Sequence, residues 1–164
     1  MDELALTELT KFVTFQSGDE FYGLKIDYVN EIIVYQDVTE IPESEDYIIG
    51  LINLRGKIIP VIDVRIRFKQ EPFPYDDRTC IIVVNYKSNT VGLIVQKIAE
   101  VVELSSEDIL PAPSIGKNET TQSKYVYGLG KVGDDVKLLL DPERLLSDAD
   151  PAEGETSLAV AEED

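Results

Sequence analysis

Hydrophobic and polar positions along most of the chain form short apolar or alternating runs, which is a pattern typical of β-strands. Residues 12–15 and 21–26 are rich in aromatic and β-branched side chains, and the segment Ser17 to Glu20 between them has the composition of a hairpin turn. Further strands are predicted over residues 57–68, 79–86, 91–104 and 136–140. Short strands at close spacing predict an all-β protein, either a sandwich or small barrels.

Two short segments predict helix. Asp27 can cap a helical turn, because apolar side chains then recur near helical spacing at Tyr28, Val29, Ile32 and Ile33. Asp141 followed by Pro142 is typical of an N-cap and a first helical position, so residues 143–146 predict a short C-terminal helix. Helices are therefore expected only at the margins of the fold.

Some predicted strands are apolar at consecutive positions, notably residues 80–84 and 138–140. Both faces of such strands must be covered, which two small barrels packed on a shared core would achieve. Pro60 cannot donate a ladder hydrogen bond, so we expect it at a strand start, a bulge or an edge.

The 164 residues fit one domain, and their charge is strongly negative, with 32 acidic and 15 basic side chains for a net charge of −17. Such a field disfavours nucleic-acid and membrane-surface partners. Residues 147–164 hold acids and no base, so we expect a folded domain over 1–148 and an acidic, disordered tail over 149–164. One basic stripe runs against this trend, with cations at Arg55, Lys57, Arg65, Arg67 and Lys69.

The chain lacks the residues of common catalytic sites. It has no histidine, which excludes Ser-His-Asp and Cys-His pairs and histidine metal ligands. Neighbouring acids such as Asp76 and Asp77 are expected in solvated turns, and Cys80 as a small buried hydrophobic residue. The chain shows no secretory signal and no apolar segment of spanning length, so we expect a cytoplasmic protein without enzymatic activity, cofactor or metal.

Residues 128–133 match the GxGxxG pattern of dinucleotide-binding loops. That site needs a helix immediately afterwards, whereas Asp134 and Asp135 lead into a leucine run. We therefore interpret the segment as a β-hairpin.

Residues 48–63 carry the most informative motif. Two apolar strands flank the turn Asn53, Leu54, Arg55 and Gly56, and the second strand contains Pro60 and ends at Asp63. Gly56 can take the positive φ that such a turn requires. The simplest interpretation is a hairpin in which Arg55 is solvated or bonded to a carboxylate.

This segment closely resembles the CheW family, in which the Asn-Leu-Arg-Gly turn, the following proline and the aspartate are hallmarks. The resemblance extends to the opening hairpin around Phe12 to Gln16, to the strand Val91–Val95 with Val101, to the loop Pro111 to Pro113, and to the closing segment Tyr127 to Leu146. It therefore covers most of the chain.

The resemblance implies two five-stranded SH3-like barrels packed around a shared hydrophobic core. It also implies a chemotaxis adaptor that couples the cytoplasmic tips of chemoreceptors to the regulatory domain of the histidine kinase CheA. Two alternatives stay open on sequence grounds: a coupler of another chemosensory pathway, such as twitching motility, and a small β-barrel ligand-binding protein.

The family pattern also implies two binding faces. The receptor-binding positions are Val29, Glu31, Gly50, Arg55 and Val101. The kinase-binding positions are Val38, Thr39, Ile41, Pro111, Pro113 and Ile115. Arg55 is the leading candidate, because a guanidinium can bond a receptor carboxylate with fixed geometry. The alternative for Val29 and Val101 is a place in the core, and for Arg55 a purely local role in the turn.

Overall fold

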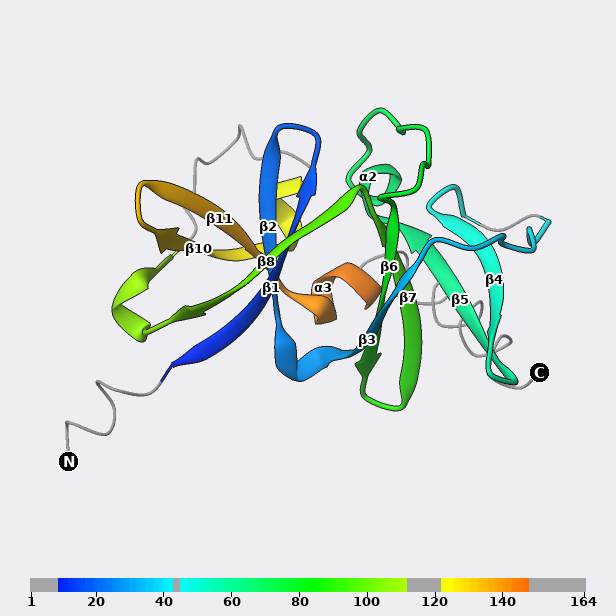
Figure 1. Ribbon diagram of the computed structural model, residues 1–164, viewed down its shortest axis with the longest axis horizontal. Helices are drawn as coiled ribbons and strands as arrows, with labels where there is room; N and C mark the ends of the chain where they lie inside the picture. The colour runs from blue at the N-terminus through cyan, green and yellow to red at the C-terminus, as the bar shows by residue number, and fades with distance from the viewer. Residues whose placement is uncertain (1–8, 43–44, 112–121, 148–164) are drawn as a thin grey trace.

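The computed structural model describes residues 9–42, 45–111 and 122–147, which form two β-sheets side by side (Figure 1). The first sheet has six strands in the order β8-β1-β2-β11-β10-β9, and the second has five in the order β3-β6-β7-β5-β4. The strands are β1 (Thr10–Ser17), β2 (Glu20–Lys25), β3 (Val29–Val34), β4 (Ile48–Leu54), β5 (Lys57–Asp63), β6 (Cys80–Tyr86), β7 (Asn89–Val95), β8 (Lys97–Leu104), β9 (Ile109–Pro111), β10 (Val126–Val132) and β11 (Asp135–Leu140).

Helical segments are short. They are α2 (Val64–Arg67), α3 (Pro142–Ser147) and the 3-10 turns η1 (Ile26–Tyr28), η2 (Ser106–Asp108) and η4 (Gln122–Tyr125). Helix α3 lies between the two sheets (Figure 1). In the described part of the chain, no helix has the length and apolarity that a membrane span requires.

Three hydrophobic clusters account for the packing. One lies within the five-stranded sheet around Ile59 and Ile81, and another within the six-stranded sheet around Phe12 and Leu139. The third and largest joins side chains of both sheets with those of α2 and α3. Each sheet thus has its own core and both pack on a shared one. This confirms the predicted all-β architecture, with the three-residue strand β9 extending one sheet to six strands.

The chain builds the six-stranded sheet in two parts. Strands β1 and β2 begin it, strands β3 to β7 form the whole second sheet, and β8 to β11 then complete the first. A parallel pairing of β11 with β2 joins the two parts of the first sheet, and a parallel pairing of β5 with β7 lies inside the second. The five-stranded sheet is therefore an insertion within the six-stranded one.

The predicted hairpins are confirmed. Gly18 has a φ of 66° in the turn between β1 and β2, and β10 pairs antiparallel with β11 across the turn that contains Gly133. The GxGxxG pattern thus lies in a hairpin, and the element that follows it directly is strand β11 instead of the helix that a dinucleotide site needs. The C-terminal helix is also confirmed, and Asp141 Oδ1 accepts a hydrogen bond from Glu143 N at 2.9 Å.

Three predictions of local structure are wrong. Residues 29–34 form strand β3 instead of continuing a helical turn, because their β-branched side chains alternate in burial and pair with β6. The strand predicted over residues 57–68 ends at Asp63, whose side chain caps α2. The strand predicted over residues 91–104 is split at Gln96 into β7 and β8, which belong to different sheets.

Pro60 lies inside β5, opposite Leu51 of β4. The pairing of β5 with β7 begins only at Val61, so Pro60 precedes the point where the strand gains its second neighbour. The missing N–H is tolerated because β5 is a local edge there, as predicted.

Asp63 is fully buried and fixes the end of the hairpin. Its Oδ1 accepts hydrogen bonds from Arg65 N at 2.9 Å and Ile66 N at 3.3 Å, and its Oδ2 accepts one from the Tyr75 hydroxyl. Burial, with the hydrogen bond to Asp63, raises the pKa of Tyr75 above its ordinary value. The motif aspartate is thus a structural residue that holds α2 and the following loop in place.

We expect the free energy of unfolding to fall as pH rises above about 10, the ordinary tyrosine pKa. Folded Tyr75 holds its proton more tightly than the unfolded chain does, so its contribution is complete below that pH and is lost as pH rises through the raised folded pKa. Tyr75→Phe should lower stability at pH 7 by about 1–2 kcal/mol and make the alkaline decline shallower. Urea unfolding at pH 7 and at higher pH measures both effects. The prediction is contradicted if the free energy of unfolding of Tyr75→Phe falls with pH as steeply as that of the wild type.

Candidate functional site

The site is built on the tight turn between β4 and β5. Arg55 and Gly56 both have positive φ, 53° and 88°, which is the conformation of a type I′ hairpin. Asn53 Oδ1 accepts a hydrogen bond from Gly56 N at 2.8 Å and so braces the turn from within. The backbone therefore presents Arg55 at the tip, with 69% of its side chain exposed.

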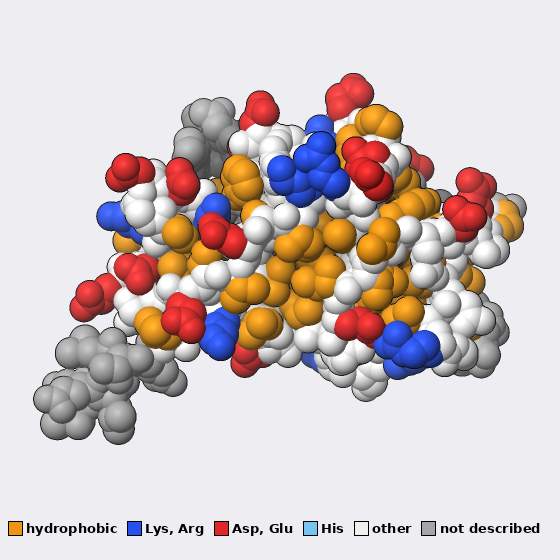
Figure 2. Space-filling view, in the orientation of Figure 1, with side chains coloured by type: hydrophobic (Ala, Val, Ile, Leu, Met, Phe, Trp, Pro, Cys, Tyr) orange, Lys and Arg blue, Asp and Glu red, His pale blue; other side chains and the backbone are white. Residues whose placement is uncertain are grey.

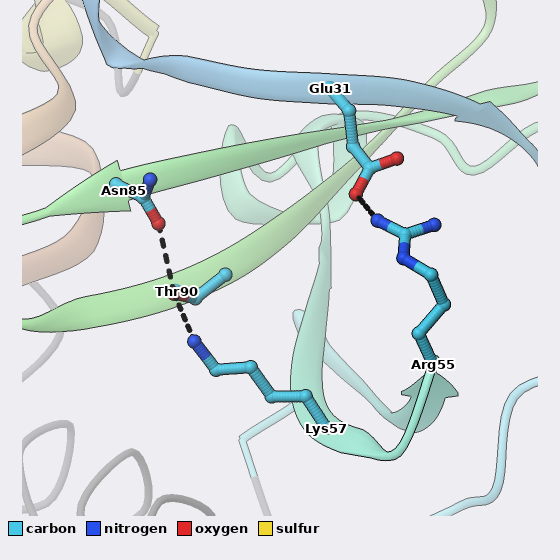
Figure 3. A network of polar contacts seen from close by, with 5 residues as sticks. All are labelled: Glu31, Arg55, Lys57, Asn85 and Thr90. Atoms are coloured by element: carbon cyan, nitrogen blue, oxygen red, sulfur yellow. Dashed lines mark hydrogen bonds and ion pairs between the residues drawn. The ribbon is translucent and has the colours of Figure 1, made fainter.

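Arg55 donates through Nη2 to Glu31 Oε2 on β3 (Figure 3). Strands β3 and β4 are opposite edges of the five-stranded sheet, so this ion pair forms only because the sheet curls until its edges meet. The segment after β3 closes the same gap, because Thr39 and Leu51 exchange two backbone hydrogen bonds of 2.8 Å. The structure thus brings together two of the five predicted receptor-binding residues.

The other predicted receptor-binding residues lie in different surroundings. Val29 is on β3, two residues before Glu31, and is partly buried against the shared core. Val101 is on β8 in the other sheet, opposite Val13, and is 55% exposed. A core role is therefore excluded for Val101, whereas Val29 lies at the margin of the core.

Gly50 lies beneath the predicted kinase-binding segment. A Cβ atom built at this position would lie 2.1 Å from the backbone oxygen of Thr39 and 2.7 Å from Val38 Cγ1. Only glycine allows the segment to cross β4 so closely. Gly50 thus belongs structurally with Val38 and Thr39.

Gly50→Ala should destabilise the fold by about 2–3 kcal/mol, because Thr39 must move away from β4; if the Val38 segment binds the kinase as the family resemblance predicts, that binding should weaken too. Gly133→Ala is a matched control, since its positive-φ glycine has open space around it. The control should cost about 1–2 kcal/mol, which is the backbone strain alone, and leave binding unchanged. Chemical denaturation and a binding titration measure the two effects; equal losses in both variants would contradict the close-approach explanation.

The predicted kinase-binding residues that the structure describes lie in two separate places. Val38 and Ile41 are partly buried and Thr39 is exposed, all in the segment that crosses to β4. Pro111 is exposed at the end of β9, in the six-stranded sheet. Pro113 and Ile115 lie outside the described residues. The structure therefore does not bring Pro111 and the Val38 segment onto one sheet.

Hydrophobic side chains gather across the middle of one face, over β8, β1 and β3 (Figure 2). The exposed large hydrophobic residues on these strands are Ile32 and Val34 on β3 and Val101 on β8. Ile32 pairs with Ile82, which is part of the shared core. The exposed apolar side chain of Ile32 therefore continues the shared core to the surface of the molecule. Sequence reasoning missed Ile32 and Val34 because it read helical spacing where the period is two.

The basic stripe expected from the sequence is not one surface. Arg67 is buried, with its guanidinium over the rings of Tyr47 and Tyr125, and donates through Nε to the Leu145 oxygen at 2.9 Å. Arg65 lies beyond the other end of β5 from Arg55. Only Arg55 and Lys57 share the end of the sheet near Glu31, where Lys57 Nζ donates to Thr90 Oγ1 at 3.1 Å (Figure 3).

The titratable and metal-ligating side chains of the described residues are few or already engaged. Among them, no group of three or more Cys, His, Asp or Glu side chains could hold a metal ion. Cys80 is partly buried at the start of β6, and burial raises the pKa of its thiol, which keeps it protonated at neutral pH. The buried aspartate Asp63 is fully engaged in capping and in the bond from Tyr75.

Comparison with known proteins gives consistent matches. Residues 11–150 match the CheW-like domain family. The chain is 40% identical over 142 residues to the chemotaxis protein CheW of Klebsiella aerogenes, covering 87% of this chain and 84% of that protein. It is 33% identical over 144 residues to the chemotaxis protein CheW of Treponema pallidum, covering 85% and 84%. The crystal structure of the scaffolding protein TtCheW from Thermoanaerobacter tengcongensis is similar with a TM-score of 0.80 at 33% identity, covering 89% of this chain and 97% of that one.

Proposed function

The chain belongs to the CheW family and is a non-enzymatic chemotaxis adaptor, and on this basis we propose that it joins the cytoplasmic tips of chemoreceptors to the regulatory domain of the histidine kinase CheA. An adaptor of this kind needs two separate surfaces, one for each partner. The cytoplasm is the compartment in which we propose that it acts.

The receptor surface is proposed at the curled edge of the five-stranded sheet. The observation that carries this proposal is the Arg55 side chain, held at a rigid turn and oriented by Glu31 at the sheet edge that carries exposed Ile32 and Val34. A receptor tip is a helical hairpin, so an apolar surface suits the apolar face of a helix, and a fixed guanidinium beside it can bond a carboxylate of that helix. Val29 and Val101 are proposed to extend the apolar part of this surface.

The kinase surface is proposed on the segment of Val38, Thr39 and Ile41, which Gly50 supports from beneath. Thr39 and Leu51 hold each other through two backbone hydrogen bonds, so the segment keeps one shape without its own strand. A preformed surface lowers the ordering cost of binding. Pro111, Pro113 and Ile115 are proposed as a second contact from the other sheet.

The test is a pull-down with each proposed partner separately. The full-length protein should retain both the kinase regulatory domain and a receptor signalling fragment from the same organism, with micromolar dissociation constants typical of transient contacts. A competition step adds one partner to the complex with the other. Simultaneous binding supports two separate surfaces, whereas mutual displacement contradicts them.

A folded protein that binds neither partner would overturn the proposed function. Circular dichroism of the same sample establishes that the β-structure is intact, which separates loss of folding from loss of recognition.

A further inference from the structure

The two cationic side chains at the turn between β4 and β5, Arg55 and Lys57, have different partners. Leu54 and Lys57 face each other across the turn, so Arg55 and Lys57 stand close together on a rigid support. The Arg55 charge is met by the Glu31 carboxylate. The Lys57 ammonium instead donates to a neutral hydroxyl, Thr90 Oγ1, at 3.1 Å.

A short chain of hydrogen bonds fixes the direction of Lys57. Thr90 Oγ1 donates in turn to Asn85 Oδ1 at 2.9 Å, so the lysine is oriented by residues of β7 and β6 (Figure 3). An ammonium has three N–H donors, and this contact uses one of them. Lys57 is exposed, and the remaining donors are available to an external acceptor.

Arg55, Glu31 and Lys57 form a corner of the five-stranded sheet whose net charge has the opposite sign to that of the whole protein. Arg55, Glu31 and Lys57 together leave one positive charge, on a chain whose net charge is −17. An acidic partner is repelled by most of the surface and attracted here, so the corner orients its approach. A carboxylate reaching Arg55 must share the guanidinium with Glu31, whereas one reaching Lys57 displaces no ionic partner.

We propose that Lys57, positioned by Thr90 and Asn85, is a second anchor of the receptor surface and binds an acidic side chain of the receptor tip beside Arg55. This inference rests on the proposed receptor function. In this proposal Lys57 speeds the association with an acidic receptor, and Arg55 makes the hydrogen bonds of fixed geometry in the bound complex. The exposed position of the ammonium predicts an effect on association that salt removes.

The test uses full-length Lys57→Gln and measures binding kinetics with a receptor signalling fragment at about 20 mM and about 500 mM salt. We expect about fivefold weaker binding at low salt, mainly through a slower association rate, and a difference below about twofold at high salt. Thr90→Val keeps the charge but removes its positioning partner, and should weaken binding about twofold. Lys131→Gln is the matched control, because it removes an exposed lysine from β10 in the other sheet and should leave binding unchanged.

The outcomes separate this inference from the function on which it rests. If wild type binds and Lys57→Gln binds equally well at low salt, the inference is wrong and the receptor function stands. If Lys131→Gln weakens binding as much as Lys57→Gln, net charge and not this corner governs the association, and the inference is also wrong. If the wild-type protein binds no receptor fragment, the proposed function itself fails.

Discussion

Arg55→Ala is expected to weaken binding of a receptor signalling fragment at least about tenfold while leaving binding of the kinase regulatory domain unchanged. The guanidinium is the one group at the turn that is rigidly presented, largely exposed and able to make paired hydrogen bonds. The melting temperature should fall by no more than about 3 °C, because an exposed ion pair contributes about 1 kcal/mol or less. Titration with each partner and a thermal melt measure the three quantities.

Variants of Glu31 distinguish direct contact from a local role of Arg55. Glu31→Gln can still accept a hydrogen bond from Arg55, so binding should change less than about threefold. Exchanging the two charges, with Glu31→Arg and Arg55→Glu in one protein, restores an ion pair while moving the cation to β3. If the exchanged protein binds receptor normally, the position of the guanidinium is unimportant and Arg55 only holds the turn.

Phe68→Ala is expected to cause the largest loss of stability, about 3–5 kcal/mol, with a fall in melting temperature of about 10 °C or more. Phe68 ends α2 and is 2% exposed. Its ring centroid lies 5.3 Å from that of Tyr22 on β2 and 5.5 Å from that of Tyr125 in η4. Phe68 therefore packs against the six-stranded sheet and against the turn that precedes β10. Removing it opens a cavity in the shared core between the sheets.

Phe73→Ala is the matched control, since it removes the same side chain from the partly exposed loop after α2. It should cost less than half as much as Phe68→Ala. Phe68→Leu should recover most of the stability because it refills most of the cavity. Similar losses in the two alanine variants would mean that the shared core does not dominate stability. Urea unfolding of all three variants gives the comparison.

Local signals predicted most of the strands. The turns at Gly18, at Arg55 and Gly56, and around Gly133 are set by residues next to one another in the chain, and the hairpins there are confirmed. The cap at Asp141 is equally local. The β-branched run after Asp27 misled the prediction because a short apolar segment fits helical and strand periods alike, and pairing with β6 decides between them.

The arrangement of the site could not be predicted from such signals. Glu31 and Arg55 meet only because the whole sheet curls, and Gly50 is constrained by Thr39 from a segment that passes over it. Both contacts depend on pairings between strands distant in sequence. The family resemblance supplied the residue identities, but the links from Lys57 to Thr90 and from Thr90 to Asn85 had no counterpart in the sequence pattern.

The insertion of one sheet within the other sets the order in which the chain can fold as it leaves the ribosome. The hairpin of β1 and β2 emerges first, yet its partners β8 and β11 are synthesised only after the entire five-stranded sheet. The strands of the inserted sheet can therefore pair with one another while the outer edges of β1 and β2 are still unpaired. Such long-range pairing slows folding and leaves strand edges exposed to other chains. We therefore expect a nascent chain stalled before β8 to depend on chaperones, although all five strands of the inserted sheet are present.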